Sequence, residues 1–216
     1  MTEREIFEKI DHTLLSVTAT EEEFITLAEE AICAHAASVC VPPNAVALLK
    51  GKFGDALRVT TVIGFPNGYA TTETKVFETQ DAIKKGADEV DMVIAVCKVK
   101  EGDYEYILSE IGAIRAASEG KVLKVIIETC LLTEQEKIKL CEIVTKAGAD
   151  YIKTSTGFSK AGATLEDVLL FKSHVGKKVK IKAAGGIRTL EDAEKFITAG
   201  ADRIGASAVI KGYLNK

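Results

Sequence analysis

The sequence predicts an α/β protein built as a single compact (β/α)8 TIM barrel. Segments typical of strands alternate with segments typical of helices along the whole chain, which is the pattern of a parallel sheet. Gly-Ala-Asp occurs three times, beginning at Gly86, Gly148 and Gly200, each time after a helical pattern and before a strand. Glycine adopts the left-handed conformation that ends helices, so these repeats mark successive strand–helix units.

The first half of the chain contains four of the predicted strands. They cover residues 11–13, 38–41, 57–65 and 89–96, the first of them being faint. A short helix precedes the first strand, and the other helices begin at the Thr20–Glu23 capping box, near residue 46 and near residue 72. Pro42-Pro43 and Pro66-Asn67-Gly68 end the second and third strands, because proline cannot donate to a sheet.

The second half repeats the unit more clearly. Its predicted strands cover residues 122–128, 151–154, 179–182 and 203–206. One helix covers 103–118, a second capping box at Thr133–Glu136 opens a helix that runs to Lys146, and Thr-Leu-Glu-Asp opens helices at Thr164 and Thr189. A short C-terminal helix follows the last strand.

Eight strand–helix units favour a closed barrel over an open, doubly wound sheet, which is the alternative. An open sheet of that kind would carry a phosphate-binding glycine motif in its first strand–helix turn. Here the glycine-rich turns come late, at Gly185-Gly186 and at Gly205, where barrels commonly hold phosphate. No linker rich in proline, glycine or serine divides the chain, so we expect one barrel domain over residues 1–216.

Composition narrows the classes of partner. The net charge is −4 and no long basic block occurs, which argues against nucleic acid as a partner. The uncharged run 31–49 contains Pro42, Pro43 and Asn44, so we expect no membrane span.

The five cysteines are odd in number and form no C-x-x-C pair, and the N-terminus is charged rather than apolar. We therefore expect reduced thiols and a cytoplasmic location. With only three histidines, none of which pairs locally with a cysteine, we expect no structural zinc site.

Candidate chemistry lies at the ends of the central strands. Strand alternation predicts an inward set with Asp91 on the fourth strand, Lys124 and Glu128 on the fifth, Lys153 on the sixth and Lys182 on the seventh. Neighbouring strands lie about 4.8 Å apart, so Lys153 and Lys182 are expected to be near neighbours. A lysine beside a second cation loses its proton more readily and can form a Schiff base with a carbonyl substrate.

Each of these residues also has a plainer interpretation. The lysines could simply end their strands and extend into solvent, and Asp91 could neutralise a lysine instead of transferring protons. Cys40 is expected to be a buried structural thiol. The polar triplet Asp11-His12-Thr13 would face the barrel mouth if the faint first strand forms.

Three turns at consecutive strand ends could bind an anion. Ser155-Thr156-Gly157, Gly185-Gly186 and Gly205-Ala206-Ser207 combine backbone N–H groups with hydroxyls. Such donors can hold phosphate without a net positive charge.

The motifs together resemble the deoxyribose-phosphate aldolase family, whose members are class I (Schiff-base) aldolases on a barrel. The resemblance covers nearly the whole chain. It rests most strongly on Glu89-Val90-Asp91-Met92, on Ile152-Lys153-Thr154-Ser155-Thr156-Gly157 and on Lys182-Ala183-Ala184-Gly185-Gly186, with further matches at 10–15, 38–41, 64–66, 123–129 and 203–207.

The resemblance implies a role for each matching residue. Lys153 would form the Schiff base, Lys182 would lower the pKa of that amine and join a proton relay, and Asp91 would be the general acid/base. The implied phosphate contacts are Gly157, Gly185, Gly186, Gly205 and Ser207. Thr13 and Asp11 would lie near the pocket, and Lys124 would help to order it.

The implied reaction is reversible cleavage of 2-deoxy-D-ribose 5-phosphate to acetaldehyde and D-glyceraldehyde 3-phosphate. It would need neither cofactor nor metal, its partners would be the small phosphosugar and aldehyde substrates, and we expect a homodimer or higher homo-oligomer. Two alternatives remain open from the sequence: a Schiff-base barrel acting on a different phosphorylated or keto-acid substrate, and a non-catalytic barrel that binds a phosphosugar.

The chain departs from the family pattern in two places. Ala95-Val96-Cys97 stands where the family usually has Asn-x-Gly, so the turn there is expected to be built differently. Some members carry a C-terminal tail whose tyrosine assists proton transfer, and Tyr213 is the residue here whose part in such a step stays open.

Overall fold

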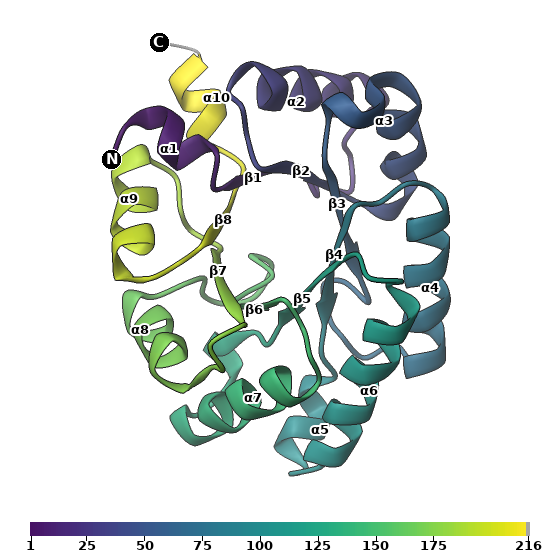
Figure 1. The fold of residues 1–216 in the computed structure, drawn as a ribbon, viewed down its shortest axis with the longest axis vertical. Coiled ribbons are helices and arrows are strands. Elements are labelled where there is room, and N and C mark those ends of the chain that lie inside the picture. The colour runs from purple at the N-terminus through teal and green to yellow at the C-terminus, as the bar shows by residue number, and fades with distance from the viewer. Residues whose placement is uncertain (215–216) are drawn as a thin grey trace.

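The computed structural model describes residues 1–214 and shows a closed barrel of eight parallel strands (Figure 1). Each strand pairs with the next in the sequence, and the last pairs with the first. The strands are β1 (Ile10–Thr13), β2 (Ser38–Val41), β3 (Val59–Ile63), β4 (Glu89–Val93), β5 (Val122–Ile126), β6 (Tyr151–Lys153), β7 (Lys180–Ala184) and β8 (Arg203–Ala206). The predicted (β/α)8 barrel is confirmed, and its faint first strand is a full member.

Helices surround the barrel on the outside (Figure 1). They are α1 (Glu3–Phe7), α2 (Glu21–Cys33), α3 (Val46–Phe53), α4 (Thr72–Lys84), α5 (Val96–Lys100), α6 (Tyr104–Ala117), α7 (Glu134–Lys146), α8 (Leu165–His174), α9 (Leu190–Ala199) and α10 (Val209–Leu214). Short 3-10 turns cover Pro43–Ala45, Gly54–Ala56 and Thr129–Leu131.

The helix starts lie where the sequence predicts them. Thr20 and Thr133 each form a complete capping box, and Thr164 and Thr189 each accept a hydrogen bond from the backbone N–H three residues on. Each such cap stabilises its helix by about 1 kcal/mol. These caps fix the length of the loop between a strand end and the next helix, and therefore the shape of the barrel mouth.

Several predicted strand ends are wrong by two or three residues. The fourth strand was expected to reach residue 96, but β4 ends at Val93 and α5 begins at Val96. The reason is tertiary: the Ala95 N–H donates to the Glu110 carboxylate, 3.1 Å away, instead of to a neighbouring strand. Similarly β3 is shorter than predicted, β5 ends at Ile126, and β7 runs from Lys180 to Ala184.

The two faces of the strands have opposite character. Side chains that point outward, such as Val90 and Met92 of β4, belong to the buried apolar layer between strands and helices. Burying such a side chain stabilises the fold by about 1.5–3 kcal/mol. Side chains that point inward, such as Glu89 and Asp91, are charged and also buried. The barrel therefore has an apolar coat and a polar axis.

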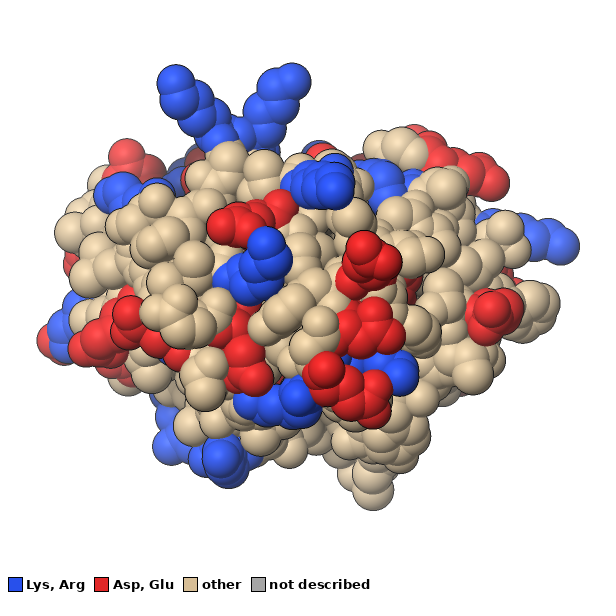
Figure 2. All heavy atoms as spheres, turned by 90° about the horizontal axis from the view of Figure 1, so that it is seen from below, with Lys and Arg blue, Asp and Glu red and all other residues tan. Residues whose placement is uncertain are grey.

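The face of the molecule drawn in Figure 2 mixes both signs of charge. On the face drawn in Figure 2, acidic and basic side chains are interspersed and form no single-sign field. Among the described helices, none has the length and apolar character needed to cross a membrane.

Candidate active site

The inside of the barrel holds a cluster of buried ionic groups, which we call the axial cluster. It contains three carboxylates and four cationic side chains, all less than 10% exposed, and these are Asp11, Glu89, Asp91, Lys124, Lys153, Lys182 and Arg203. Buried charge is costly unless it is paired, so this cluster constrains every strand that contributes to it. Because the cluster has four cationic and three anionic side chains, its net charge becomes zero when one cation loses its proton.

Asp91 joins the three lysines of the cluster. Its Oδ1 accepts a hydrogen bond from Lys124 at 2.8 Å, and its Oδ2 accepts bonds from both Lys153 and Lys182 at 2.7 Å. Burial alone would raise the pKa of Asp91, but the three ammonium groups hold this pKa well below its ordinary value. Asp91 is therefore held as a carboxylate by its three ammonium partners.

The two lysines predicted to be neighbours do lie together, because their Nζ atoms bond to the same oxygen of Asp91. The alignment of the two strands places Lys153 directly beside Lys182. The plainer interpretation, in which both lysines extend into solvent, is wrong: Lys153 is 3% exposed and Lys182 is fully buried.

Their surroundings differ. Lys182 also donates to Asp11, and although burial would lower the pKa of Lys182, Asp11 and Asp91 raise it above its ordinary value. Within residues 1–214, Lys153 has Asp91 as its one carboxylate partner. Burial lowers the pKa of Lys153, and the positive charge of Lys182 lowers it further. The Asp91 carboxylate acts in the opposite direction. Of the two, Lys153 is the amine that can be present without its proton.

A cavity of about 500 Å³ opens above Lys153 at the carboxyl ends of the strands. The sequence-predicted residues that line it are Thr13, Lys153, Gly157, Gly185, Gly186, Gly205 and Ser207. Asp91, Lys124 and Lys182 lie in the axial cluster instead of on the cavity wall. The structure thus brings all ten predicted residues into one region, in two layers.

The glycine turns approach one another closely. Gly157 and Gly185 have φ of +84° and +90°, in the left-handed region that favours glycine. A side chain at Gly185 would place its Cβ 2.9 Å from the Cα of Gly162. These turns therefore expose backbone on the cavity wall. Gly205, which was expected in a turn, lies inside β8 instead.

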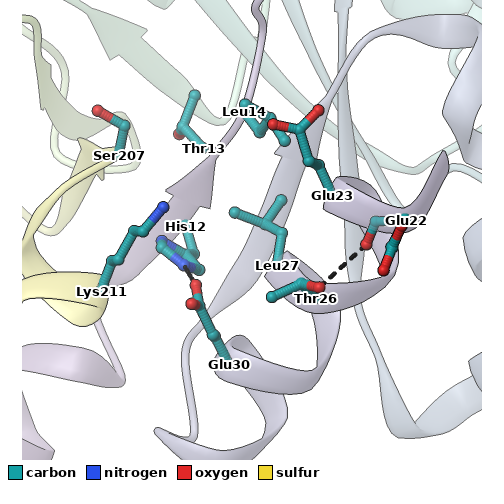
Figure 3. Close-up of a pocket in the computed structure, with 10 residues that line it drawn as sticks. All are labelled: His12, Thr13, Leu14, Glu22, Glu23, Thr26, Leu27, Glu30, Ser207 and Lys211. Carbon is teal, nitrogen blue, oxygen red and sulfur yellow. Dashed lines mark hydrogen bonds and ion pairs between the residues drawn. The ribbon is translucent and has the colours of Figure 1, made fainter. Parts of the chain in front are cut away.

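The polar triplet on β1 divides between the two faces of the strand. Asp11 points inward to the axial cluster, and Thr13 lines the cavity. His12 points to the other side, into a second cavity of about 430 Å³ between α2 and α10, where it bonds to Glu30 at 2.8 Å (Figure 3). The expectation that the whole triplet faces the mouth is therefore wrong for His12, because adjacent residues of a strand point to opposite faces.

Two members of the axial cluster, Glu89 and Arg203, were not predicted from the sequence. Arg203 donates to Asp11 at 2.5 Å and to Glu89 at 3.2 Å, at the amino end of the strands. The signal was present, since Glu89 lies two residues before Asp91 on the same face of β4. Glu89 and Arg203 are the first residues of β4 and β8, where a charged side chain is easily interpreted as solvent-exposed.

Two residues named from the sequence, Cys40 and Tyr213, do not line the substrate cavity. Cys40 is a buried thiol whose pKa burial raises, in keeping with its predicted structural character. The ring of Tyr213 packs edge-on against Phe7 of α1, with the ring centroids 5.1 Å apart. Within residues 1–214, no group of three or more histidine, cysteine, aspartate and glutamate side chains is placed to hold a metal ion.

Fold and site together define the class: a (β/α)8 barrel with a lysine amine beneath a cavity at its mouth, suited to react with a carbonyl group. The DeoC/LacD family aldolase model matches residues 6–214, and the chain belongs to this family.

Individual relatives are similar to the chain over nearly its full length. The chain is 56% identical to the deoxyribose-phosphate aldolase of Clostridioides difficile strain 630, over 99% of this chain and 97% of the relative. It is 54% identical to the deoxyribose-phosphate aldolase of Streptococcus agalactiae strain A909, over 99% and 96%. Among solved structures, the deoxyribose phosphate aldolase of Aeropyrum pernix superposes with a TM-score of 0.91 at 32% identity, over 99% of this chain and 92% of that one.

Proposed function

We propose that this protein is a deoxyribose-phosphate aldolase, which reversibly cleaves 2-deoxy-D-ribose 5-phosphate to acetaldehyde and D-glyceraldehyde 3-phosphate. The observation that carries the proposal is the placement of Lys153. Its amine pairs with the Asp91 carboxylate and lies at the floor of a cavity lined by glycine turns. The names of the relatives at 54% and 56% identity support the choice of substrate.

In the proposed first step, the Lys153 ammonium releases its proton to solvent through the open cavity, while Asp91 stays a carboxylate 2.7 Å away. The free amine attacks C1 of the open-chain sugar, and loss of water from the carbinolamine leaves an iminium ion. Lys182 keeps its charge throughout because Asp11 and Asp91 raise its pKa. Its role is to disfavour a second positive charge on Lys153.

In the second step the iminium accepts the electron pair of the C2–C3 bond. A base removes the proton of the C3 hydroxyl, C3 becomes the aldehyde of glyceraldehyde 3-phosphate, and C1 and C2 remain on Lys153 as an enamine. Protonation at C2 and hydrolysis of the resulting imine release acetaldehyde. Asp91 is the proposed proton carrier, since it is the carboxylate that bonds to both lysines.

The phosphate is proposed to lie against the glycine turns. Gly157, Gly185, Gly186 and Ser207 line the same cavity as Lys153 and offer backbone N–H groups and a hydroxyl. Thr13 and Gly205 complete that wall, and Lys124 holds Asp91 in place from below.

The test is to incubate the protein with acetaldehyde and cyanoborohydride and to locate the reduced adduct by peptide mass spectrometry. We expect N-ethyllysine at Lys153. An adduct on Lys182 instead would exchange the roles of the two lysines, and no selective adduct in folded protein would favour a barrel that only binds a phosphosugar.

We also propose that residues 1–216 form one catalytic domain that works as a homo-oligomer in the cytoplasm. The Aeropyrum pernix relative is described as a tetramer, and Phe77 and Val17 here are highly exposed apolar side chains. All five cysteines are free thiols, which suits a reducing compartment. Light scattering of the purified protein checks the assembly.

A further inference from the structure

We propose that Glu128 is a positioning residue for this reaction: its carboxylate holds the turn after Lys153, so that one wall of the substrate cavity stands at a fixed place relative to the Lys153 amine. The proposal rests on the aldolase function proposed above. Glu128 does not line the substrate cavity itself, so it acts through the residues that it binds.

The backbone of Glu128 is unusual for its location. Its φ of 57° and ψ of 66° are left-handed. Among the non-glycine residues of 1–214, His35 and Glu119 share a positive φ. His35 and Glu119 are exposed and lie just beyond the ends of α2 and α6, where left-handed residues commonly end helices. Glu128 instead follows a strand and is 3% exposed. A strained, buried residue at a barrel mouth is a marker of function.

This conformation makes a bulge between β5 and β6. The Ile127 N–H donates to the Lys153 carbonyl at 3.1 Å, and the Thr129 N–H donates to the Thr154 carbonyl at 2.9 Å. The donors are two residues apart but the acceptors are adjacent, so Glu128 is an extra residue in the ladder. The bulge turns the Glu128 side chain toward the loop that leaves β6.

The carboxylate then holds that loop at one residue. Both oxygens of Glu128 accept from the Thr156 N–H at 3.3 Å, and one of them accepts from the Thr156 hydroxyl. The Thr156 Oγ in turn accepts from the Phe158 N–H at 3.0 Å. Thr156, Gly157 and Phe158 line the substrate cavity, so the chain of bonds runs from the bulge to the cavity wall.

Glu128 lies close enough to Lys153 for the charge of Lys153 to affect the pKa of the Glu128 carboxyl. Burial raises the pKa of Glu128, while the bonds from Thr156 and the charge of Lys153 oppose this rise. Glu128 also borders a smaller cavity of about 120 Å³ that shares Thr156 and Phe158 with the substrate cavity. Its carboxylate thus stands directly behind the wall that it positions.

The test compares Glu128→Ala with Glu119→Ala, a matched control in which an exposed glutamate with the same left-handed backbone is truncated. For Glu128→Ala we expect the KM for deoxyribose 5-phosphate to rise about tenfold or more, because misplacement of about 1 Å can cost that much. The rate of acetaldehyde trapping on Lys153 should change less than twofold, because acetaldehyde has two carbons and carries no phosphate for this wall to position. Glu119→Ala should leave both quantities at the wild-type values.

Conservative and double variants keep the test decisive if Glu128→Ala folds poorly. Glu128→Gln retains an acceptor oxygen and should recover most of the KM. In a Thr156→Val background, the further change Glu128→Ala should raise the KM less than it does in the wild-type background, because the two residues hold the wall as one unit. Three results would overturn the proposal: an unchanged KM in Glu128→Ala, a trapping rate that falls by as large a factor as the KM rises, or additive effects in the double variant. Failure of the wild-type protein to trap acetaldehyde at Lys153 would instead overturn the aldolase function.

Discussion

Two buried lysines of this protein, Lys153 and Lys75, have similar burial but different surroundings. Lys153 is 3% exposed inside the barrel mouth, and Lys75 is fully buried between α4 and α6. Burial lowers the pKa of both. Neither burial nor the direction of the pKa shift tells a reactive lysine from a structural one.

Their hydrogen bonds do distinguish them. Lys75 donates to the Gly68 carbonyl at 2.6 Å, to the Val93 carbonyl at 2.8 Å and to Glu110 at 2.6 Å. An ammonium group has three N–H bonds, so Lys75 is saturated. Lys153 donates to Asp91 alone among the described side chains and borders a cavity. Unused hydrogen-bonding capacity next to open space marks the lysine that can react.

The most severe test replaces the reactive lysine itself. Lys153→Arg and Lys153→Ala should both reduce turnover to background, because arginine does not release its proton to become an amine nucleophile. Steady-state assays together with circular dichroism, which shows whether each variant is folded, measure this. Wild-type turnover in Lys153→Arg would mean that another group is the nucleophile.

The structural lysine should show the opposite pattern. Lys75→Met should lower the free energy of unfolding by about 3–5 kcal/mol, because Glu110 is left as an unpaired buried charge. Urea denaturation measures this loss, and the folded fraction should still trap acetaldehyde at Lys153. Lys75→Met combined with Glu110→Met should regain part of the stability. Wild-type stability in the single variant would show that the pair is not structural.

A third variant alters the surroundings of Lys153 without touching it. Lys182→Leu removes a cation next to Lys153 and leaves Asp91 less neutralised, and both changes raise the pKa of the Lys153 amine. The pH–rate profile for Schiff-base formation should therefore move to higher pH by about one unit or more. A profile that stays in place would exclude a pKa-lowering role for Lys182.

The smallest expected effect concerns the far end of the substrate. Ser207→Glu places a negative charge on the cavity wall, where the phosphate is proposed to lie. The KM for deoxyribose 5-phosphate should rise about tenfold, while the KM for free deoxyribose should change little, since like charges repel. Equal changes for both sugars would place the phosphate elsewhere.

Much of this organisation was predictable from short segments. The strand–helix order, the threonine caps and the strand-end position of Lys153 could be predicted, because alternation and capping act within a few residues. The end of β4 and the bulge at Glu128 were not predicted. The first depends on Glu110 of α6, and the second depends on pairing with β6.

The sequence by itself determined which residue types stand at which strand ends, and thus the lysines, the carboxylates and the glycine turns of the site. The tertiary structure decided how the charges pair. Closure of β8 against β1 completes the barrel and brings Asp11 to Lys182, 171 residues away, while Lys153 pairs with Asp91 alone among the described carboxylates. Such pairing depends on register and closure around the whole barrel, and no single segment contains that information.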